Sequence, residues 1–254
     1  MSVLAIVPAK SRSTGIPGKN LKPLAGRSPM NRAIDVCNAL YDTLDDYVVS
    51  SDVDWAANER VFGDAPARRY GQWLKRPVEL AQDDTPMIDV VKHALGEIPG
   101  PPDQIIVLLP PTQPLREPKH ITEALRMLSG GMDYDSVVSI TPIPRTHAPD
   151  FVMMYCDTTL TMSPYTRSWE DWRRTPPPQR RQDVPWPYVR DGTVYAFFRK
   201  TVATYGDIYG ELVGPLVIPP EETCALDTEA DWREAERRLS EREAAHRREP
   251  RGAW

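Results

Sequence analysis

The sequence predicts an α/β fold with a mostly parallel central sheet. Three runs are almost entirely apolar and leave no room for the alternation of a half-exposed strand, namely residues 3–7, 105–109 and 136–140. Such runs are typical of strands buried on both faces, as in a parallel sheet. Helical segments are predicted between them, and this alternation indicates an α/β protein.

The first elements illustrate the alternation. Strand 3–7 ends at Pro8, and a helix is expected after Ser28, an N-cap residue that precedes a proline. Strand 47–50 follows, and Asp52 is expected to cap a helix that runs through Val61. The later predicted elements are a helix after Thr85-Pro86, strand 105–109, a helix at about 118–129, strand 136–140, short strands at 151–155 and 159–162, strands 193–198 and 215–219, and a final helix capped by Thr228 and Asp231.

Length and composition limit the function. The 254 residues are expected to form a single domain, 1–254, with residues 142–190 as an insertion in which prolines interrupt the pattern. The net charge of 31 − 36 = −5 argues against a nucleic-acid partner. Three widely spaced cysteines predict reduced thiols, with neither a disulfide framework nor a zinc site. With no signal peptide and no membrane-length apolar stretch, we expect a soluble, cytoplasmic protein without a membrane partner.

The loop after strand 3–7 is the first candidate site. It holds the cations Lys10, Arg12 and Lys19 among hydroxyl side chains and glycines. Cationic side chains and tightly turning backbone N–H groups bind polyphosphates, and this loop leaves the carboxyl end of a strand, where open α/β sheets bind ligands. The segment fits neither the Walker A pattern nor the dinucleotide G-x-G-x-x-G pattern. A solvated surface loop is the alternative interpretation.

A second set of polar residues follows strand 105–109. Thr112, Gln113 and Arg116 lie just beyond its carboxyl end and are therefore expected to face the same crevice. Five segments together resemble the CMP-sugar-acid synthetases, also called acylneuraminate cytidylyltransferases. They are Pro8-Ala9-Lys10 with the G-x-P-x-K-N of residues 15–20, R-P-x-E-L-A-x-D at 76–83, P-T-x-P-L-R at 111–116, R-Q-x-x-P at 181–185 and D-T-x-x-D at 227–231.

The resemblance implies a Rossmann-like, three-layer nucleotidyltransferase fold with a small dimerisation arm at 142–190 that also helps to close the acceptor pocket. It implies a cytidylyltransferase that moves CMP from CTP to an acidic acceptor, a sialic-acid-like sugar acid or a related compound, with release of pyrophosphate. Mg²⁺ is the implied cofactor, and a homodimer the implied assembly. Such chemistry depends on positioning and charge neutralisation more than on a nucleophilic side chain.

The resemblance also assigns roles to residues. It places catalytic cations at Lys10, Arg12 and Lys19, and the metal ligand at Asp227. The nucleotide-binding set is Ala9, Lys10, Ser11, Gly15, Lys19, Asn20, Arg76 and Met87. The acceptor-binding set is Thr112, Gln113, Arg116, Gln182, Arg190 and Asp191.

Several positions depart from the family pattern. Lys10 replaces an arginine and loses its bidentate fork, and Ala225 stands where a first metal-binding aspartate is expected. Met87 replaces a serine near the base, and Pro110 replaces a glutamine that faces the acceptor. Asp191 replaces an asparagine, and its charge would repel an acid unless a neighbouring cation offsets it, for which Arg190 is the candidate.

These departures leave alternatives open. One is a nucleotidyltransferase of the same fold that uses another base, or a small phosphonate or carboxylate acceptor. Another, of a different class, is a nucleotide-binding protein with impaired catalysis, which the alanine at position 225 suggests. The sequence leaves the acceptor, the base and the number of metal ions undecided.

Overall fold

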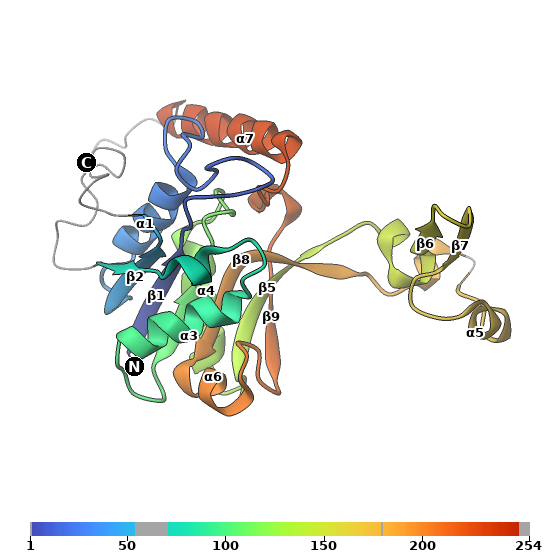
Figure 1. Ribbon diagram of the computed structural model, residues 1–254, viewed down its shortest axis with the longest axis horizontal. Helices are drawn as coiled ribbons and strands as arrows, with labels where there is room; N and C mark the ends of the chain where they lie inside the picture. Colours follow the sequence, from blue (N-terminus) through green and yellow to red (C-terminus); the bar gives the residue numbers. More distant parts are fainter. Residues whose placement is uncertain (1, 54–70, 179, 249–254) are drawn as a thin grey trace.

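One seven-stranded sheet forms the centre of the molecule (Figure 1). The computed structural model describes residues 2–53, 71–178 and 180–248. The strand order is β3-β2-β1-β4-β8-β5-β9. The strands are β1 (Val3–Pro8), β2 (Asp46–Ser51), β3 (Gln72–Lys75), β4 (Ile105–Leu108), β5 (Ser136–Pro142), β8 (Tyr188–Phe198) and β9 (Val213–Val217).

The sheet is mostly parallel, as predicted. Strand β1 pairs in parallel with both β2 and β4, β2 pairs in parallel with β3, and β5 with β9. Only β8 runs the other way, between β4 and β5. The carboxyl ends of β1, β2, β3 and β4 therefore lie at one edge of the sheet. The loop after β1 that holds Lys10, Arg12 and Lys19, called the cationic loop below, emerges at this edge.

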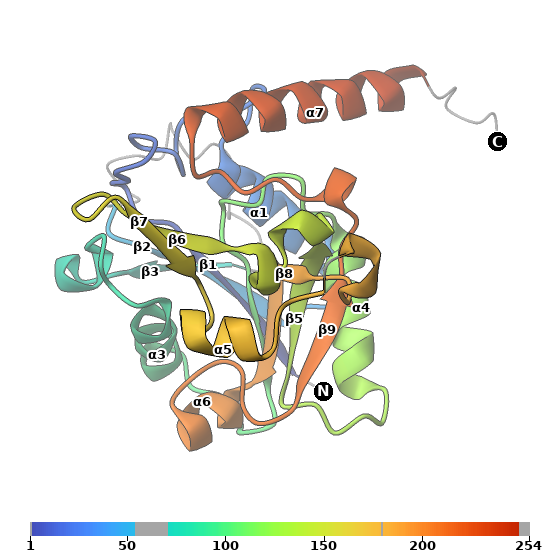
Figure 2. The ribbon, with the colours of Figure 1, turned by 90° about the vertical axis from the view of Figure 1, so that its right-hand side faces the viewer.

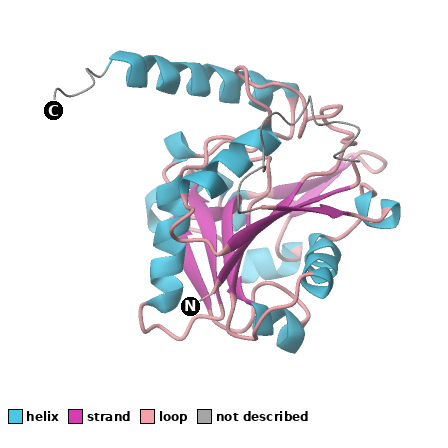
Figure 3. Cartoon of the chain, turned by 90° about the vertical axis from the view of Figure 1, so that its left-hand side faces the viewer, coloured by secondary structure: helices cyan, strands magenta, loops and turns pink. Residues whose placement is uncertain are grey.

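Helices cover both faces of the sheet and complete three layers (Figure 3). One apolar core joins the sheet to α1 (Pro29–Ala39) and α4 (Pro118–Ser129), and another joins it to α3 (Met87–Glu97) and α6 (Arg199–Tyr205). All six residues of β1 are buried, as its apolar sequence predicts. The expected cap of α1 is present, because Ser28 Oγ accepts a hydrogen bond from Asn31 N at 3.2 Å.

The last helix, α7 (Glu229–Arg248), lies across the edge of the sheet from which the cationic loop emerges (Figures 1 and 2). A third apolar cluster contains Ile16 from that loop, Leu226 from the segment before α7, Trp232 from the first turn of α7, and Leu115 from the segment after β4. The predicted cap is formed by Thr228 Oγ1, which accepts a hydrogen bond from Asp231 N at 3.2 Å. Helix α7 is thus packed directly against the two segments that carry the predicted site.

Residues between β5 and β8 form an arm that projects from the body (Figure 1). It contains the hairpin of β6 (Met153–Cys156) and β7 (Thr161–Pro164), followed by α5 (Trp169–Arg174). Its exposed apolar residues include Met154, Tyr155, Leu160, Met162, Tyr165 and Trp186.

Some elements differ from the sequence predictions. Strand β3 and helices α5 and α6 were not predicted, since each is short and without a long apolar stripe. Strand β8 begins five residues earlier than the predicted 193–198, because its first part pairs with the outgoing end of β5. The helix predicted through Val61 lies outside the described residues. Among the helices that the structure describes, none has the length and apolarity needed to cross a membrane.

Candidate active site

A cavity of about 250 Å³ lies at the carboxyl ends of β1 and β4. Its walls come from the cationic loop, from the segment between β3 and α3, and from residues 110–112. Six of the predicted site residues line it together: Lys10, Lys19, Asn20, Arg76, Met87 and Thr112. The structure thus brings five of the eight predicted nucleotide-binding residues, and one predicted acceptor-binding residue, to one place from three separate parts of the chain.

The cationic loop is fixed at its start by hydrogen bonds to the end of β2. Ala9 N donates to Ser50 O at 2.9 Å. The Asp52 carboxylate accepts from Ser11 N at 2.7 Å and from Ser11 Oγ at 2.5 Å. Asn20 then closes the loop, because its Nδ2 donates to Lys10 O at 2.8 Å. Ala9 and Ser11 therefore shape the loop and do not line the cavity, and Gly15 also lies outside the cavity wall.

The two lysines of the cavity already have oxygen partners. Lys10 Nζ lies 2.5 Å from Asp83 Oδ1, and Lys19 Nζ donates to Leu226 O at 2.7 Å. Asp227 Oδ1 lies 3.7 Å from Lys19 Nζ. Arg12, the third predicted cation, is exposed and does not line the cavity. The positive charge that lines the cavity is therefore that of Lys10, Lys19 and the buried Arg76.

Two buried polar atoms belong to residues of the cavity wall and have no hydrogen-bond partner among the described residues. They are Ser13 Oγ and Asn20 Oδ1. Buried polar atoms without a partner are uncommon, since each loses its hydrogen bonds to water. An unpaired hydroxyl and an unpaired amide oxygen beside two lysines indicate a place built for a polar ligand.

Arg76 forms the floor of the cavity and is only 4% exposed. Its Nη2 donates to Ser50 O at 2.7 Å and its Nε to Ser50 Oγ at 3.1 Å. Burial lowers the pKa of Arg76 to about 10, and the nearby Asp52 carboxylate opposes that shift. The guanidinium therefore stays charged at neutral pH. Met87 and Val90 of α3 give this end of the cavity an apolar wall.

The predicted acceptor-binding residues are not gathered in the cavity. Arg116 is buried and donates to Thr193 O at 2.5 Å through Nε and to Pro110 O at 2.7 Å through Nη2. Gln113 is also buried, with its amide donating to Asp191 O. Both side chains join the segment after β4 to strand β8. Thr112 alone of this set lines the cavity.

Arg190 does not offset the charge of Asp191, contrary to the prediction. The register between β5 and β8 shifts between the pairs Ile140–Arg190 and Val138–Tyr195, and the two side chains have different partners. Arg190 Nη1 donates to Tyr209 OH, while the Asp191 carboxylate accepts from Thr193 Oγ1. The cation whose charge interacts with Asp191 is the buried Arg116. Gln182 lies on the arm, where its carbonyl oxygen accepts from Arg145 Nη1 at 3.3 Å.

The predicted metal ligand, Asp227, is not among the residues that line the cavity but lies beside Lys19, which is. The Asp227 side chain is 76% exposed and faces Lys19. Ala225, at the other expected ligand position, is exposed as well. The described residues contain no group of three or more histidine, cysteine, aspartate or glutamate side chains that could hold a metal ion. Mg²⁺ often uses one or two carboxylates together with substrate phosphates, so a single carboxylate beside a triphosphate cavity fits this ion.

Sequence reasoning missed part of the cavity wall. Asp83, Gln82 and Ser13 line it, and none was assigned a role. Gln82 O accepts from Lys10 Nζ at 3.3 Å, so this segment holds the lysine from two sides. The sequence did hold one signal for this part of the wall. Asp83 is a charged residue at the end of R-P-x-E-L-A-x-D, the motif whose Arg76 is expected beside the nucleoside.

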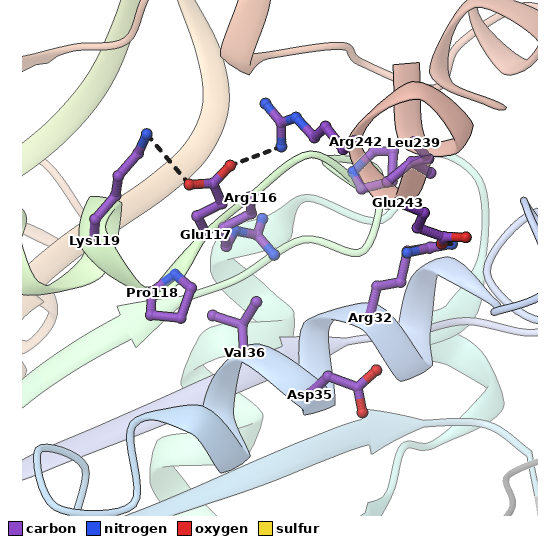
Figure 4. A pocket seen from close by; sticks show the side chains of 11 residues that line it. Arg32, Asp35, Val36, Arg116, Glu117, Pro118, Lys119, Leu239, Arg242 and Glu243 are labelled. Atoms are coloured by element: carbon purple, nitrogen blue, oxygen red, sulfur yellow. Dashed lines mark ion pairs between the residues drawn. The ribbon is translucent and has the colours of Figure 1, made fainter. Parts of the chain in front are cut away.

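A larger cavity of about 790 Å³ lies between α1, α7 and residues 114–119 (Figure 4). Its charged groups pair with one another. Glu117 lies 2.9 Å from Arg242 and 3.2 Å from Lys119, and Arg32 lies 3.5 Å from Glu243. It contains no residue of the cationic loop. We place the candidate active site in the smaller cavity, because that one joins the strand ends to the lysines and the unpaired polar atoms.

Comparison with known proteins identifies the family of the chain. Residues 4–162 match the cytidylyltransferase family. An N-acylneuraminate cytidylyltransferase of Escherichia coli O18:K1:H7 is 30% identical over 173 residues, which are 68% of this chain and 38% of that protein. The CMP-N,N'-diacetyllegionaminic acid synthase of Legionella pneumophila is 27% identical over 248 residues, which cover 91% of this chain and 94% of that protein.

Several of these relatives are longer than the chain. It spans 38% of the E. coli protein and 52% of an N-acylneuraminate cytidylyltransferase from Streptococcus agalactiae serotype III. Among solved structures, a CMP:2-keto-3-deoxy-manno-octonic acid synthetase complexed with CTP superposes with a TM-score of 0.65 at 14% identity, over 95% of this chain and 100% of that chain. That likeness confirms the predicted nucleotidyltransferase fold. The matched profile covers most of the chain, and the chain therefore belongs to the cytidylyltransferase family that includes the CMP-sugar-acid synthetases.

Proposed function

We propose that the protein transfers CMP from CTP to an acidic sugar acceptor and releases pyrophosphate. The observation that carries this proposal is the meeting of Lys10, Lys19, Asn20 and Arg76 in one cavity at the strand ends. The relatives that are named as N-acylneuraminate and CMP-legionaminic acid enzymes support the acceptor class. Family membership supports the cytidylyl donor.

In the proposed reaction, a hydroxyl oxygen of the acceptor attacks the α-phosphorus of CTP. A new P–O bond forms, the bond from that phosphorus to the bridging oxygen breaks, and the hydroxyl proton is lost. Negative charge grows on the leaving pyrophosphate. Lys10 and Lys19 stabilise that charge, since fixed cations in a partly enclosed site act strongly on phosphate oxygens. Asn20 and Arg76 orient the nucleoside at the deeper end of the cavity.

We propose Mg²⁺ as the cofactor, with Asp227 as its protein ligand. The carboxylate is exposed and lies 3.7 Å from Lys19 Nζ, a lysine of the cavity wall. When bound, Mg²⁺ would neutralise phosphate oxygens and align the triphosphate. With alanine at 225, the remaining ligands would be substrate oxygens and water.

We also propose a homodimer formed through the arm. Leu160 is 76% exposed, Tyr155 68% and Met162 58%, all on or beside the β6–β7 hairpin. An exposed cluster of this kind favours a protein interface. Light scattering of the purified chain should give the mass of two copies, and Leu160→Asp with Met162→Asp should return it to one. A cytoplasmic location is proposed as well, supported by the three free cysteines.

The proposal is tested first by binding and then by turnover. CTP at a hundred times its dissociation constant should stabilise the fold by roughly 2.7 kcal/mol in a thermal shift assay. The other nucleotides at that same concentration should stabilise the fold less. Pyrophosphate release is then measured with CTP, Mg²⁺ and a panel of sugar acids. Lys19→Ala should lose both signals, while Lys22→Ala, whose lysine stacks on Trp232 at 4.7 Å outside the cavity, keeps them.

One observation favours a second candidate function. The acceptor side of the cavity is formed by Pro110, Pro111 and Thr112, which carry no charge, while Arg116 and Arg190 are engaged elsewhere. A nucleotidyltransferase of the same fold with a small phosphonate or carboxylate acceptor fits that wall, and Met87 allows another base. The panel therefore includes such acids and all four nucleotides. CTP binding without turnover on any acceptor would indicate a catalytically impaired nucleotide-binding protein.

A further inference from the structure

Gly15 lies against the backbone of Asp227, the residue that starts the segment leading into α7. A Cβ atom added at Gly15 would be 2.8 Å from the Asp227 carbonyl oxygen and 3.9 Å from its carbonyl carbon. Among the described glycines, those with positive φ do not include Gly15. Its backbone is therefore one that other residues adopt, and what requires glycine here is the close approach of two chain segments.

The same contact region holds Leu226 between the two loops of the site. Leu226 N donates to Thr112 O at 3.0 Å, and Leu226 O accepts from Lys19 Nζ at 2.7 Å. The side chains of Ile16 and Leu226 are both fully buried in one apolar cluster. Moving the Gly15 and Asp227 backbones apart would cost free energy. The Asp227 carbonyl opposite Gly15 belongs to a stretch of backbone that Leu226 anchors in this cluster.

We propose that Gly15 is a positioning residue that sets where the Asp227 carboxylate stands relative to Lys19. The inference rests on the proposed function, in which Asp227 holds Mg²⁺. With only hydrogen on its Cα, Gly15 lets Asp227 approach until Oδ1 is 3.7 Å from Lys19 Nζ. Any side chain at position 15 pushes the 226–227 backbone outward and moves the carboxylate away from the place where the triphosphate meets Lys19. Gly15 thus positions the proposed metal ligand, whereas its motif suggested a role in binding the nucleotide.

The first test needs neither nucleotide nor metal. Amide hydrogen exchange is measured on the full chain for a peptide that contains residues 224–228, where Leu226 N–H is protected by Thr112. In Gly15→Ala the exchange of this peptide should rise by about tenfold or more, since its local opening becomes easier. Gly96→Ala is the matched control, because a Cβ there meets nothing within 4 Å. Exchange in Gly15→Ala equal to that of the control would overturn the inference.

The second test separates metal from nucleotide. Mg²⁺ is titrated into each variant at saturating CTP, and CTP binding is measured separately without Mg²⁺. Gly15→Ala should raise the Mg²⁺ concentration for half-saturation by about tenfold, as changes behind a metal ligand typically do. Its CTP affinity without Mg²⁺ should stay within about twofold. In an Asp227→Asn background, Gly15→Ala should add nothing further, since the two changes act through one group.

Thr228→Ala provides a variant for the case in which Gly15→Ala does not fold. It removes the α7 cap, in which Thr228 Oγ1 accepts from Asp231 N at 3.2 Å, but keeps the glycine at position 15 and the bond from Asp227 N to Asp231 Oδ2. Its Mg²⁺ requirement should stay within about twofold of wild type, because such a cap stabilises the helix end rather than the carboxylate. A tenfold rise in this variant would show that α7 positions Asp227, and would overturn the inference. If the wild-type chain binds no CTP, the proposed function fails, while the exchange measurement still decides the role of Gly15.

Discussion

Lys10 Nζ and Asp83 Oδ1 lie 2.5 Å apart on the wall of the candidate active-site cavity. One residue belongs to the loop after β1 and the other to the segment before α3, so this ion pair closes the cavity between two parts of the chain. It also places a negative charge where a triphosphate would bind. A phosphate group must either displace Asp83 from Lys10 or approach it with a metal ion that offsets the charge.

Asp83→Asn should therefore strengthen the binding of CTP in the absence of Mg²⁺. The change frees Lys10 and removes the repulsion between carboxylate and phosphate. Because Lys10 and Asp83 are both partly exposed, the gain should be modest, about two- to fivefold in the dissociation constant. Titration calorimetry at low salt measures it. Asp84→Asn is the control, since Asp84 is exposed and does not line the cavity. Weaker binding by Asp83→Asn would contradict this account.

Ala225→Asp should lower the Mg²⁺ requirement of the reaction. Ala225 is exposed beside the buried Leu226 and two residues before Asp227, so a carboxylate can be added there without disturbing the core. A second carboxylate increases the negative charge available to the cation. The added carboxylate should contribute roughly 1 kcal/mol to the binding free energy of Mg²⁺. The Mg²⁺ concentration for half-maximal turnover should therefore fall by about three- to tenfold. Ala230→Asp, at another exposed position, is the control. An equal effect of that change would show that added negative charge, and not a ligand at position 225, lowers the Mg²⁺ requirement.

Arg116→Lys should destabilise the fold rather than weaken acceptor binding. The guanidinium donates to Thr193 O and Pro110 O, and a lysine cannot satisfy both carbonyls in that geometry. The free energy of unfolding should fall by about 2–3 kcal/mol, the cost of leaving buried polar groups unpaired. Urea unfolding measures this, with Arg126→Lys on the exposed face of α4 as the control. Unchanged stability together with a raised acceptor KM would restore the predicted acceptor role.

Glu222 should make the stability depend on pH at the acid side. Hydrogen bonds from Lys119 and then His120, each at 2.8 Å, hold the pKa of Glu222 below its usual value of 4.5. A carboxylate with a lowered pKa stabilises the fold above its unfolded pKa, and that contribution is lost as the pH falls through the folded pKa.

Glu222→Gln should therefore melt about 2 °C lower than wild type at pH 7. The two melting curves should converge as the pH is lowered below 4.5 and the Glu222 carboxylate takes up a proton. Scanning fluorimetry across this range measures the difference between the two proteins. Glu221→Gln, at an exposed neighbour, serves as the control. A difference that persists undiminished at the acid end would show that the charge of Glu222 is not its cause.

Much of the body could be predicted from the sequence because its signals are local. The all-apolar β1 and β4 could only be strands buried on both faces, and Ser28-Pro29 marks the start of α1. Strand β3 gave no such signal. Its residues Gln72–Lys75 are exposed or half-buried at the edge of the sheet, so they are held by pairing with β2 rather than by a buried face.

The candidate site was predictable where a motif and a strand end coincide. Lys10, Lys19, Asn20 and Arg76 meet in the cavity because parallel strands bring their carboxyl ends to one edge. The acceptor side was not predictable in this way. Arg190 and Asp191 are neighbours in sequence, but their side chains bond to different partners at a register shift of β8, and the buried cation whose charge acts on Asp191 comes from position 116. Such pairings depend on the register between strands, which the sequence pattern does not specify.

Both ends of the arm are clamped into the same sheet. Ile140, Thr141 and Pro142 of β5 pair with Arg190, Val189 and Tyr188 of β8, and β8 then continues between β4 and β5 to Phe198. A change in the sequence or length of the segment between these paired strands thus leaves the strand pairing in the rest of the sheet unchanged. The arm can therefore change in length and sequence while the cavity at the strand ends stays the same.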